Sequence, residues 1–82
     1  MEMMVVIPID AYRAMLEKCD ASRPEYPLLK NGVIARNSEG NEQLEIICGP
    51  EEAKQIVDFA ATNCPELSPF ISFILPAAPN LV

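Results

Sequence analysis

Three cysteines, Cys19, Cys48 and Cys64, are the strongest candidate nucleophiles in this 82-residue sequence, and histidine is absent. Histidine is the usual activator of a catalytic thiol or hydroxyl, the usual general base and the commonest metal ligand. A nucleophile in this chain would need a lysine or a carboxylate as its base, and the sequence contains no serine-lysine motif of that kind. The sequence therefore predicts a protein that is not an enzyme, and it indicates no cofactor.

Cys48 is the cysteine for which a catalytic role is worth considering. Gly49-Pro50 follows it and is typical of a helix start, and the positive end of a helix dipole lowers the pKa of a nearby thiol. Cys48 is therefore a candidate reactive thiol, and a thiol-dependent or small-ligand-binding enzyme is one alternative function. The structural interpretation is that all three cysteines pack as small hydrophobic residues on apolar faces of the expected helices and strands.

The cysteine spacing also bears on the compartment. The three residues are too widely spaced for a zinc site or a CxxC motif, and an odd number cannot pair completely within one chain. Free thiols are typical of a reducing compartment. Glu2 stands where a secretory signal would be basic, so we expect a cytoplasmic protein.

Acidic residues outnumber basic ones by twelve to six, which gives a net charge of -6. The glutamates around residues 39–52 lack the ligand spacing of a calcium loop, so no metal site is predicted. The basic residues are scattered, whereas nucleic-acid binding depends on clustered Lys and Arg. The same balance disfavours an anionic membrane surface, and the apolar stretch over residues 70–75 is too short to span a bilayer. We therefore expect no nucleic-acid and no membrane partner.

Two segments have the spacing of amphipathic helices. The first runs from about Ala11 to Cys19, with Asp10 as its expected N-cap. The second starts at Gly49-Pro50, has two glutamates at the positive end of its dipole, and ends before Pro65. Their expected inward stripes are Tyr12, Met15 and Leu16 in the first helix, and Ala53, Ile56, Val57, Ala60 and Cys64 in the second.

A shorter helical turn is expected between these helices. Proline disfavours a helical backbone in the residue before it, so Pro27 predicts an extended Tyr26. A single turn over residues 27–30, closed by Asn31-Gly32, remains.

The clearest strand pattern is a β-hairpin. Residues 33–36 and 43–48 flank a polar connection that contains Gly40. Residues 3–7 form an apolar run that is typical of a buried strand, and a packed extended arm is the alternative. As a strand, the run can add to either edge of the hairpin, so the strand order stays open. Residues 70–75 fit a short helix and a strand equally well.

Together these elements predict a small single α+β domain over residues 1–76. Two amphipathic helices pack on an antiparallel sheet that is centred on the β-hairpin and has three strands if the N-terminal run joins it. We expect both helices to contact the sheet face that carries Leu44 and Ile46. Residues 77–82 are expected to form a flexible tail.

The apolar side chains exceed what two helices and a hairpin can cover. Either the terminal runs complete the core of one chain, or they form an interface with another chain. On the second interpretation, the candidate contact residues are Ile47, Phe70, Ile71 and Phe73. Ile47 is an anomaly in its expected strand, because it shares a mostly polar face with Glu45. The hypothesis that follows is a non-catalytic, acidic protein-interaction module, homodimeric and either an accessory protein or encoded by a mobile element. The alternative from the same charge balance is an acidic decoy that inhibits a basic, nucleic-acid-binding protein.

Overall fold

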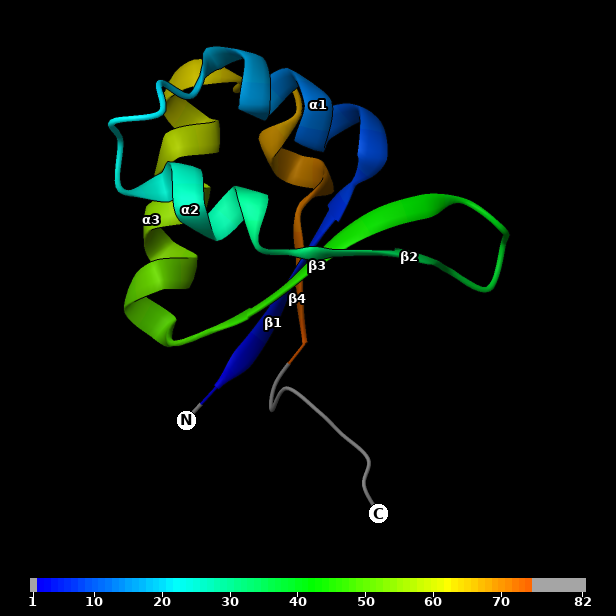
Figure 1. Cartoon of the computed structure of the whole chain (residues 1–82). Coiled ribbons are helices and arrows are strands. Elements are labelled where there is room, and N and C mark those ends of the chain that lie inside the picture. The colour runs from blue at the N-terminus through cyan, green and yellow to red at the C-terminus, as the bar shows by residue number, and fades with distance from the viewer. Residues whose placement is uncertain (1, 75–82) are drawn as a thin grey trace.

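The computed structural model describes residues 2–74, which form three α-helices, one 3₁₀ turn and a four-stranded antiparallel sheet (Figure 1). The elements in chain order are β1 (Met3–Pro8), α1 (Ile9–Lys18), α2 (Glu25–Lys30), β2 (Val33–Arg36), β3 (Glu42–Cys48), α3 (Pro50–Asn63), η1 (Ser68–Phe70) and β4 (Ser72–Ile74). The predicted α+β domain is confirmed, with one strand more than the three expected. The predicted tail over residues 77–82 lies outside the described residues.

The sheet has the order β2-β3-β1-β4, which answers the question of where the N-terminal run adds. β1 pairs with β3, so Met4 lies opposite Ile47 and Val6 opposite Glu45. β4 then pairs with the other side of β1. The apolar run over residues 3–7 therefore forms an interior strand, and Val5 within it is fully buried.

The C-terminal apolar segment contains both structures that its sequence allowed. Ser68–Phe70 forms the 3₁₀ turn η1, and Ser72–Ile74 forms the edge strand β4. Ile71 connects the two with an extended backbone. The segment is ambiguous from sequence because each structure occupies only three residues.

α1 begins earlier than predicted. It starts at Ile9, directly after Pro8 ends β1, and it has no side-chain N-cap hydrogen bond. Asp10 therefore lies in the first turn, near the positive end of the helix dipole, and is not the cap.

The prediction for α2 is wrong in its first half. α2 begins at Glu25, so Tyr26 is helical and not extended. Pro27 is the third residue of the helix, where a backbone N–H has no intrahelical acceptor and its absence costs little. The Asn31 N–H donates a hydrogen bond to the Pro27 carbonyl at 3.0 Å and ends the helix.

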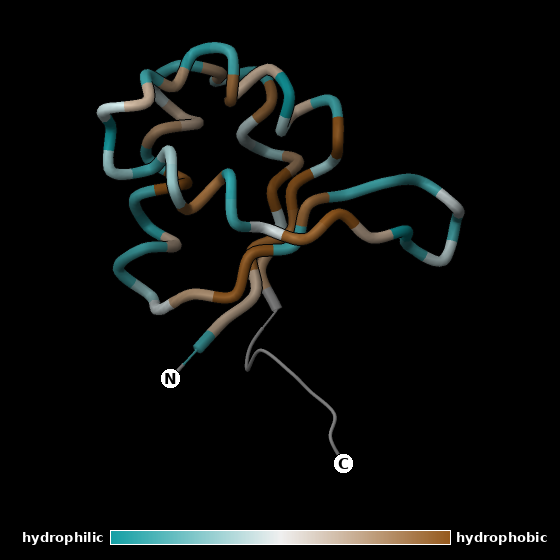
Figure 2. Tube along the Cα trace, in the orientation of Figure 1, coloured by the Kyte–Doolittle hydropathy of each residue, from teal (hydrophilic) through white to brown (hydrophobic). Residues whose placement is uncertain are grey.

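All three helices lie on one face of the sheet, and the β2–β3 loop projects away from them (Figure 1). The inward residues of the sheet are Val5, Ile7, Leu44, Ile46 and Cys48, and the helices cover them with Ala11, Met15, Leu29, Ala53, Ile56, Phe59 and Ala60. Figure 2 shows hydrophobic residues concentrated where β1 and β3 pass the helices, and hydrophilic residues in the hairpin loop. The predicted packing of both helices against the Leu44 and Ile46 face is therefore confirmed.

Gly32 is required by the close approach of the chain to the sheet after α2. A Cβ atom at this position would lie 2.8 Å from Leu44 Cγ and 3.0 Å from Ile46 Cγ1. Because Leu44 is buried and tightly packed, we expect Gly32→Ala to lower the free energy of unfolding by about 1–3 kcal/mol. Urea unfolding measures the loss.

Gly49→Ala is the control for this prediction. A Cβ at Gly49 would meet only Glu52 Oε1 at 3.6 Å, so we expect a smaller loss of stability. Equal losses for the two variants would show that the contact with Leu44 and Ile46 does not explain the glycine.

Candidate functional site

The structure separates the four predicted contact residues. Ile47 is 59% exposed and lies opposite Met4, on the face of the sheet that the helices leave uncovered. Phe73 is 44% exposed but lies opposite Val5, so it faces the helix-covered side at the sheet edge. Phe70 is exposed on the 3₁₀ turn, and Ile71 belongs to the core. These residues therefore do not form one continuous surface, and Ile71 is buried in the core, where it cannot contact a partner.

The face of the sheet that no element within residues 2–74 covers, called the open face below, is rich in apolar side chains. The pairing register assigns to it Met4 and Val6 from β1, Val33 and Ala35 from β2, Gln43, Glu45 and Ile47 from β3, and Ser72 from β4. Val33 is 66% exposed. A solvated sheet face is usually polar, so exposed Val33 and Ile47 are unexpected at these positions. The open face is consequently the main candidate for a binding surface.

The open face contains a hollow of about 330 Å³. It is lined by Met4, Asn31, Val33, Glu45 and Ile47, which come from three strands and from the end of α2. Its volume is at the lower end of the range for small-molecule pockets and suits one or two inserted side chains. The sequence identifies Ile47 as an apolar residue on a mostly polar strand face. It does not show that Met4 and Val33 lie next to Ile47, because this depends on the strand order.

Among the residues that line the hollow, Glu45 alone is charged. Glu45 lines the hollow, and its Oε2 accepts a hydrogen bond from Gln43 Nε2 at 2.9 Å. All six basic residues of the chain lie among the described residues, and none is on the open face of a strand. Four of them lie on helices: Arg13 and Lys18 on α1, Lys30 on α2 and Lys54 on α3. Arg23 precedes α2. Arg36 is on β2, opposite Glu42, and its register position is on the face opposite to the open face.

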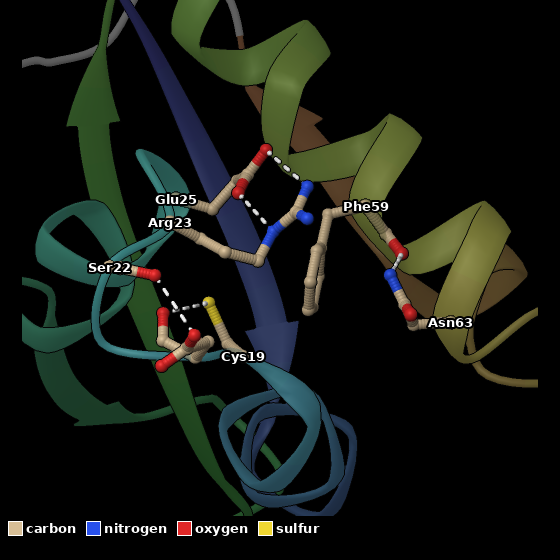
Figure 3. A network of polar contacts seen from close by, with 7 residues as sticks. Cys19, Ser22, Arg23, Glu25, Phe59 and Asn63 are labelled. Atoms are coloured by element: carbon tan, nitrogen blue, oxygen red, sulfur yellow. Dashed lines mark hydrogen bonds and ion pairs between the residues drawn. The ribbon is translucent and has the colours of Figure 1, made fainter.

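A separate polar network joins the start of α2 to α3 (Figure 3). Arg23 Nε lies 3.0 Å from Glu25 Oε1, and the Arg23 guanidinium lies 5.2 Å from the centre of the Phe59 ring. Glu25 is only 7% exposed, and its carboxylate raises the pKa of Arg23. The ion pair gives the buried Glu25 carboxylate a cationic partner at the start of α2, and the contact of Arg23 with Phe59 connects this segment to α3.

Cys48 does not have the environment of a reactive thiol. Burial, with smaller contributions from the carboxylates of Glu52 and Glu2, raises its pKa. The hypothesis of a lowered pKa is therefore wrong. Glu52 already occupies the start of α3, where its Oε1 accepts a hydrogen bond from the Gly49 N–H at 2.9 Å. Cys19 is also buried with a raised pKa, and Cys64 is a buried free thiol.

Thiol labelling tests this environment. We expect iodoacetamide at about pH 8 to modify Cys48 at least tenfold more slowly in the folded chain than in urea, as judged by mass spectrometry.

The raised pKa of Cys48 in the folded chain also makes the stability of the protein depend on pH. The resulting contribution to the free energy of unfolding is fully present below the ordinary thiol pKa of about 8.5. That stabilisation is lost as the pH rises through the higher folded-state pKa.

The matched comparison is between cysteines in the same molecule. Cys19, Cys48 and Cys64 are all expected to react slowly because all three are buried. A folded chain in which Cys48 reacts far faster than the other two would restore the thiol-dependent alternative.

The remaining features of the described chain indicate no specific chemistry. Within residues 2–74, no group of three or more cysteine, aspartate or glutamate side chains is placed so that it could hold a metal ion. In the same range, no helix combines the length and the apolar composition that a membrane span requires. Comparison with protein-family models, with curated proteins and with solved structures finds no match for this chain, so the geometry of the open face carries the functional argument.

Proposed function

We propose that this chain is a non-catalytic protein-interaction module that binds another protein through its open face. The observation that carries the proposal is the exposure of Ile47, a large apolar side chain at 59% exposure on an interior strand. Met4 and Val33 border the same hollow. Phe70 and Phe73 are exposed elsewhere and are not part of the proposed contact surface.

Covering the open face would stabilise the protein. Full burial of a valine or isoleucine side chain contributes about 1.5–3 kcal/mol, so covering Val33 and Ile47 would add on the order of 2 kcal/mol. Small domains have a thin stability margin, and association is a common source of additional stability. The three buried free thiols support our proposal that the module acts in the reducing cytoplasm.

The homodimer expected from the sequence stays a prediction. Light scattering of the reduced protein at two salt concentrations measures its solution mass. Twice the chain mass of 9.0 kDa would mean that a second copy covers apolar surface, and a single chain mass would leave the open face to a different protein.

Site-specific photo-crosslinking in cells tests the module itself. A benzophenone amino acid in place of Ile47 is expected to give a discrete crosslinked adduct, because this side chain lies at the proposed contact. The same amino acid in place of Gln55, which is exposed on α3, is the control and is expected to give none. Equal adducts from both positions, or none from position 47, would refute the proposal.

A further inference from the structure

We infer that the occupant of the open face is a basic amphipathic helix of another protein, an inference that rests on the proposed function. The opposite face of the same sheet is covered by α1, α2 and α3, so a helix on the open face would complete a three-layer arrangement. Helices bind apolar surfaces through side chains spaced three and four residues apart.

The position of the hollow favours a helix over an added strand. Met4 and Ile47 belong to the interior strands β1 and β3, while Val33 belongs to the edge strand β2. A strand added at an edge would lie about 4.8 Å beyond β2 or β4 and would leave these interior side chains uncovered. A helix lying over the face contacts all three residues at once.

The charge distribution favours a basic partner. Glu45 lines the hollow and its carboxylate accepts a hydrogen bond from Gln43, and the described strands present no Lys or Arg on this face. A lysine or arginine beside the apolar stripe of the partner helix would pair with Glu45, while its hydrocarbon stem lies along Ile47.

The same charges argue against stacking two copies of this chain through their open faces. A contact in which the two hollows face each other would bring two Glu45 side chains together, between chains that each carry a net charge of -6. Like charges across an interface oppose association. A face of this kind would also serve the decoy function, in which it masks a basic helix of a nucleic-acid-binding protein.

A pair of synthetic helices tests the inference directly. One peptide of about 18 residues, roughly five helical turns, carries leucine on one side and lysine on the other. The matched peptide carries glutamate in place of lysine. In NMR titrations of the isotopically labelled full chain, we expect the lysine peptide to shift the amide signals of Val33, Glu45 and Ile47. The glutamate peptide is expected to bind at least tenfold more weakly, and the lysine peptide to lose affinity as salt rises.

Two pairs of variants separate specific binding from general attraction. Ile47→Thr keeps a β-branched residue and is expected to weaken binding about tenfold, whereas Ile34→Thr, on the other face of the hairpin, leaves it unchanged. Glu45→Gln is expected to weaken binding about threefold, and Glu39→Gln in the hairpin loop changes the net charge equally without this effect. Melting temperatures near that of the wild type show that each variant is folded.

The outcomes distinguish this inference from the function on which it rests. If the two peptides bind equally, or if the control variants weaken binding as much as the open-face variants, the basic helix is the wrong partner. If position 47 gives a crosslinked adduct of twice the chain mass, the occupant is a second copy and the inference is overturned. If the crosslink is discrete but the lysine peptide does not bind, only the basic-helix inference fails.

Discussion

Ile56→Asp is expected to unfold the domain. Ile56 is fully buried near the middle of α3, where it packs in the core with the inward residues of the sheet. An aspartate there would be a buried carboxylate with no cation among the core residues around it, and the variant would also lose the apolar contact. We expect a loss of about 4 kcal/mol or more, which is comparable with the whole stability of a small domain. Circular dichroism and the dispersion of NMR signals measure the loss of the fold.

The neighbouring residue provides the control for this experiment. Gln55 is exposed on the same helix, so Gln55→Asp introduces the same side chain at the same depth along α3 but in water. We expect it to remain folded, with only a small change in stability. A folded Ile56→Asp variant with an unchanged melting temperature would contradict the observed orientation of α3.

The elements that the sequence predicted well have strong local determinants. Gly49-Pro50 and the two glutamates that follow define the start of α3, and the observed helix begins at Pro50. The polar loop between residues 36 and 42 defines the hairpin. These determinants act within a few residues, so neighbouring sequence is enough to identify them.

The strand order of the sheet could not be predicted, because it depends on contacts between segments that are far apart in the sequence. Both faces of β1 are apolar, so its alternation could not show whether it pairs with β2 or with β3. The position of β1 in the sheet is therefore not encoded in the spacing of its own residues.

Tyr26 differs from its prediction for a local reason. Pro27 disfavours a helical backbone in the residue before it, but Pro27 lies in the first turn of α2, where a proline is tolerated.

The candidate site was only partly visible for the same reason. Ile47 could be identified from the sequence because it lies among polar residues on one face of β3. Val33 and Met4 join it only through the pairing of three strands, which brings them around one hollow. The apolar composition that the phenylalanines share with Ile47 does not place them on the same surface, because the register puts Ile47 and Phe73 on opposite faces of the sheet.

Phe59 shows how a neighbouring helix changes the buried side of an amphipathic helix. The predicted stripe of α3 included Val57 and omitted Phe59, yet Val57 is partly exposed and Phe59 is buried. α2 packs against α3, and Arg23, just before α2, lies over the Phe59 ring. The buried side of α3 is therefore wider than contact with the sheet alone would require.

Phe59→Ala is expected to lower the free energy of unfolding by about 3–4 kcal/mol, because it leaves a cavity between α2 and α3 and removes the ring beneath Arg23. Urea unfolding measures the loss, and Phe70→Ala is the matched control, since the same side chain is 62% exposed there and should cost less than about 1 kcal/mol. Combining each variant with Arg23→Ala isolates the contact between the guanidinium and the ring. We expect a coupling of about 0.5–1 kcal/mol with Phe59 and none with Phe70. Equal losses for the two phenylalanine variants would mean that Phe59 does not hold α2 against α3, because its burial would then contribute no more than an exposed ring does.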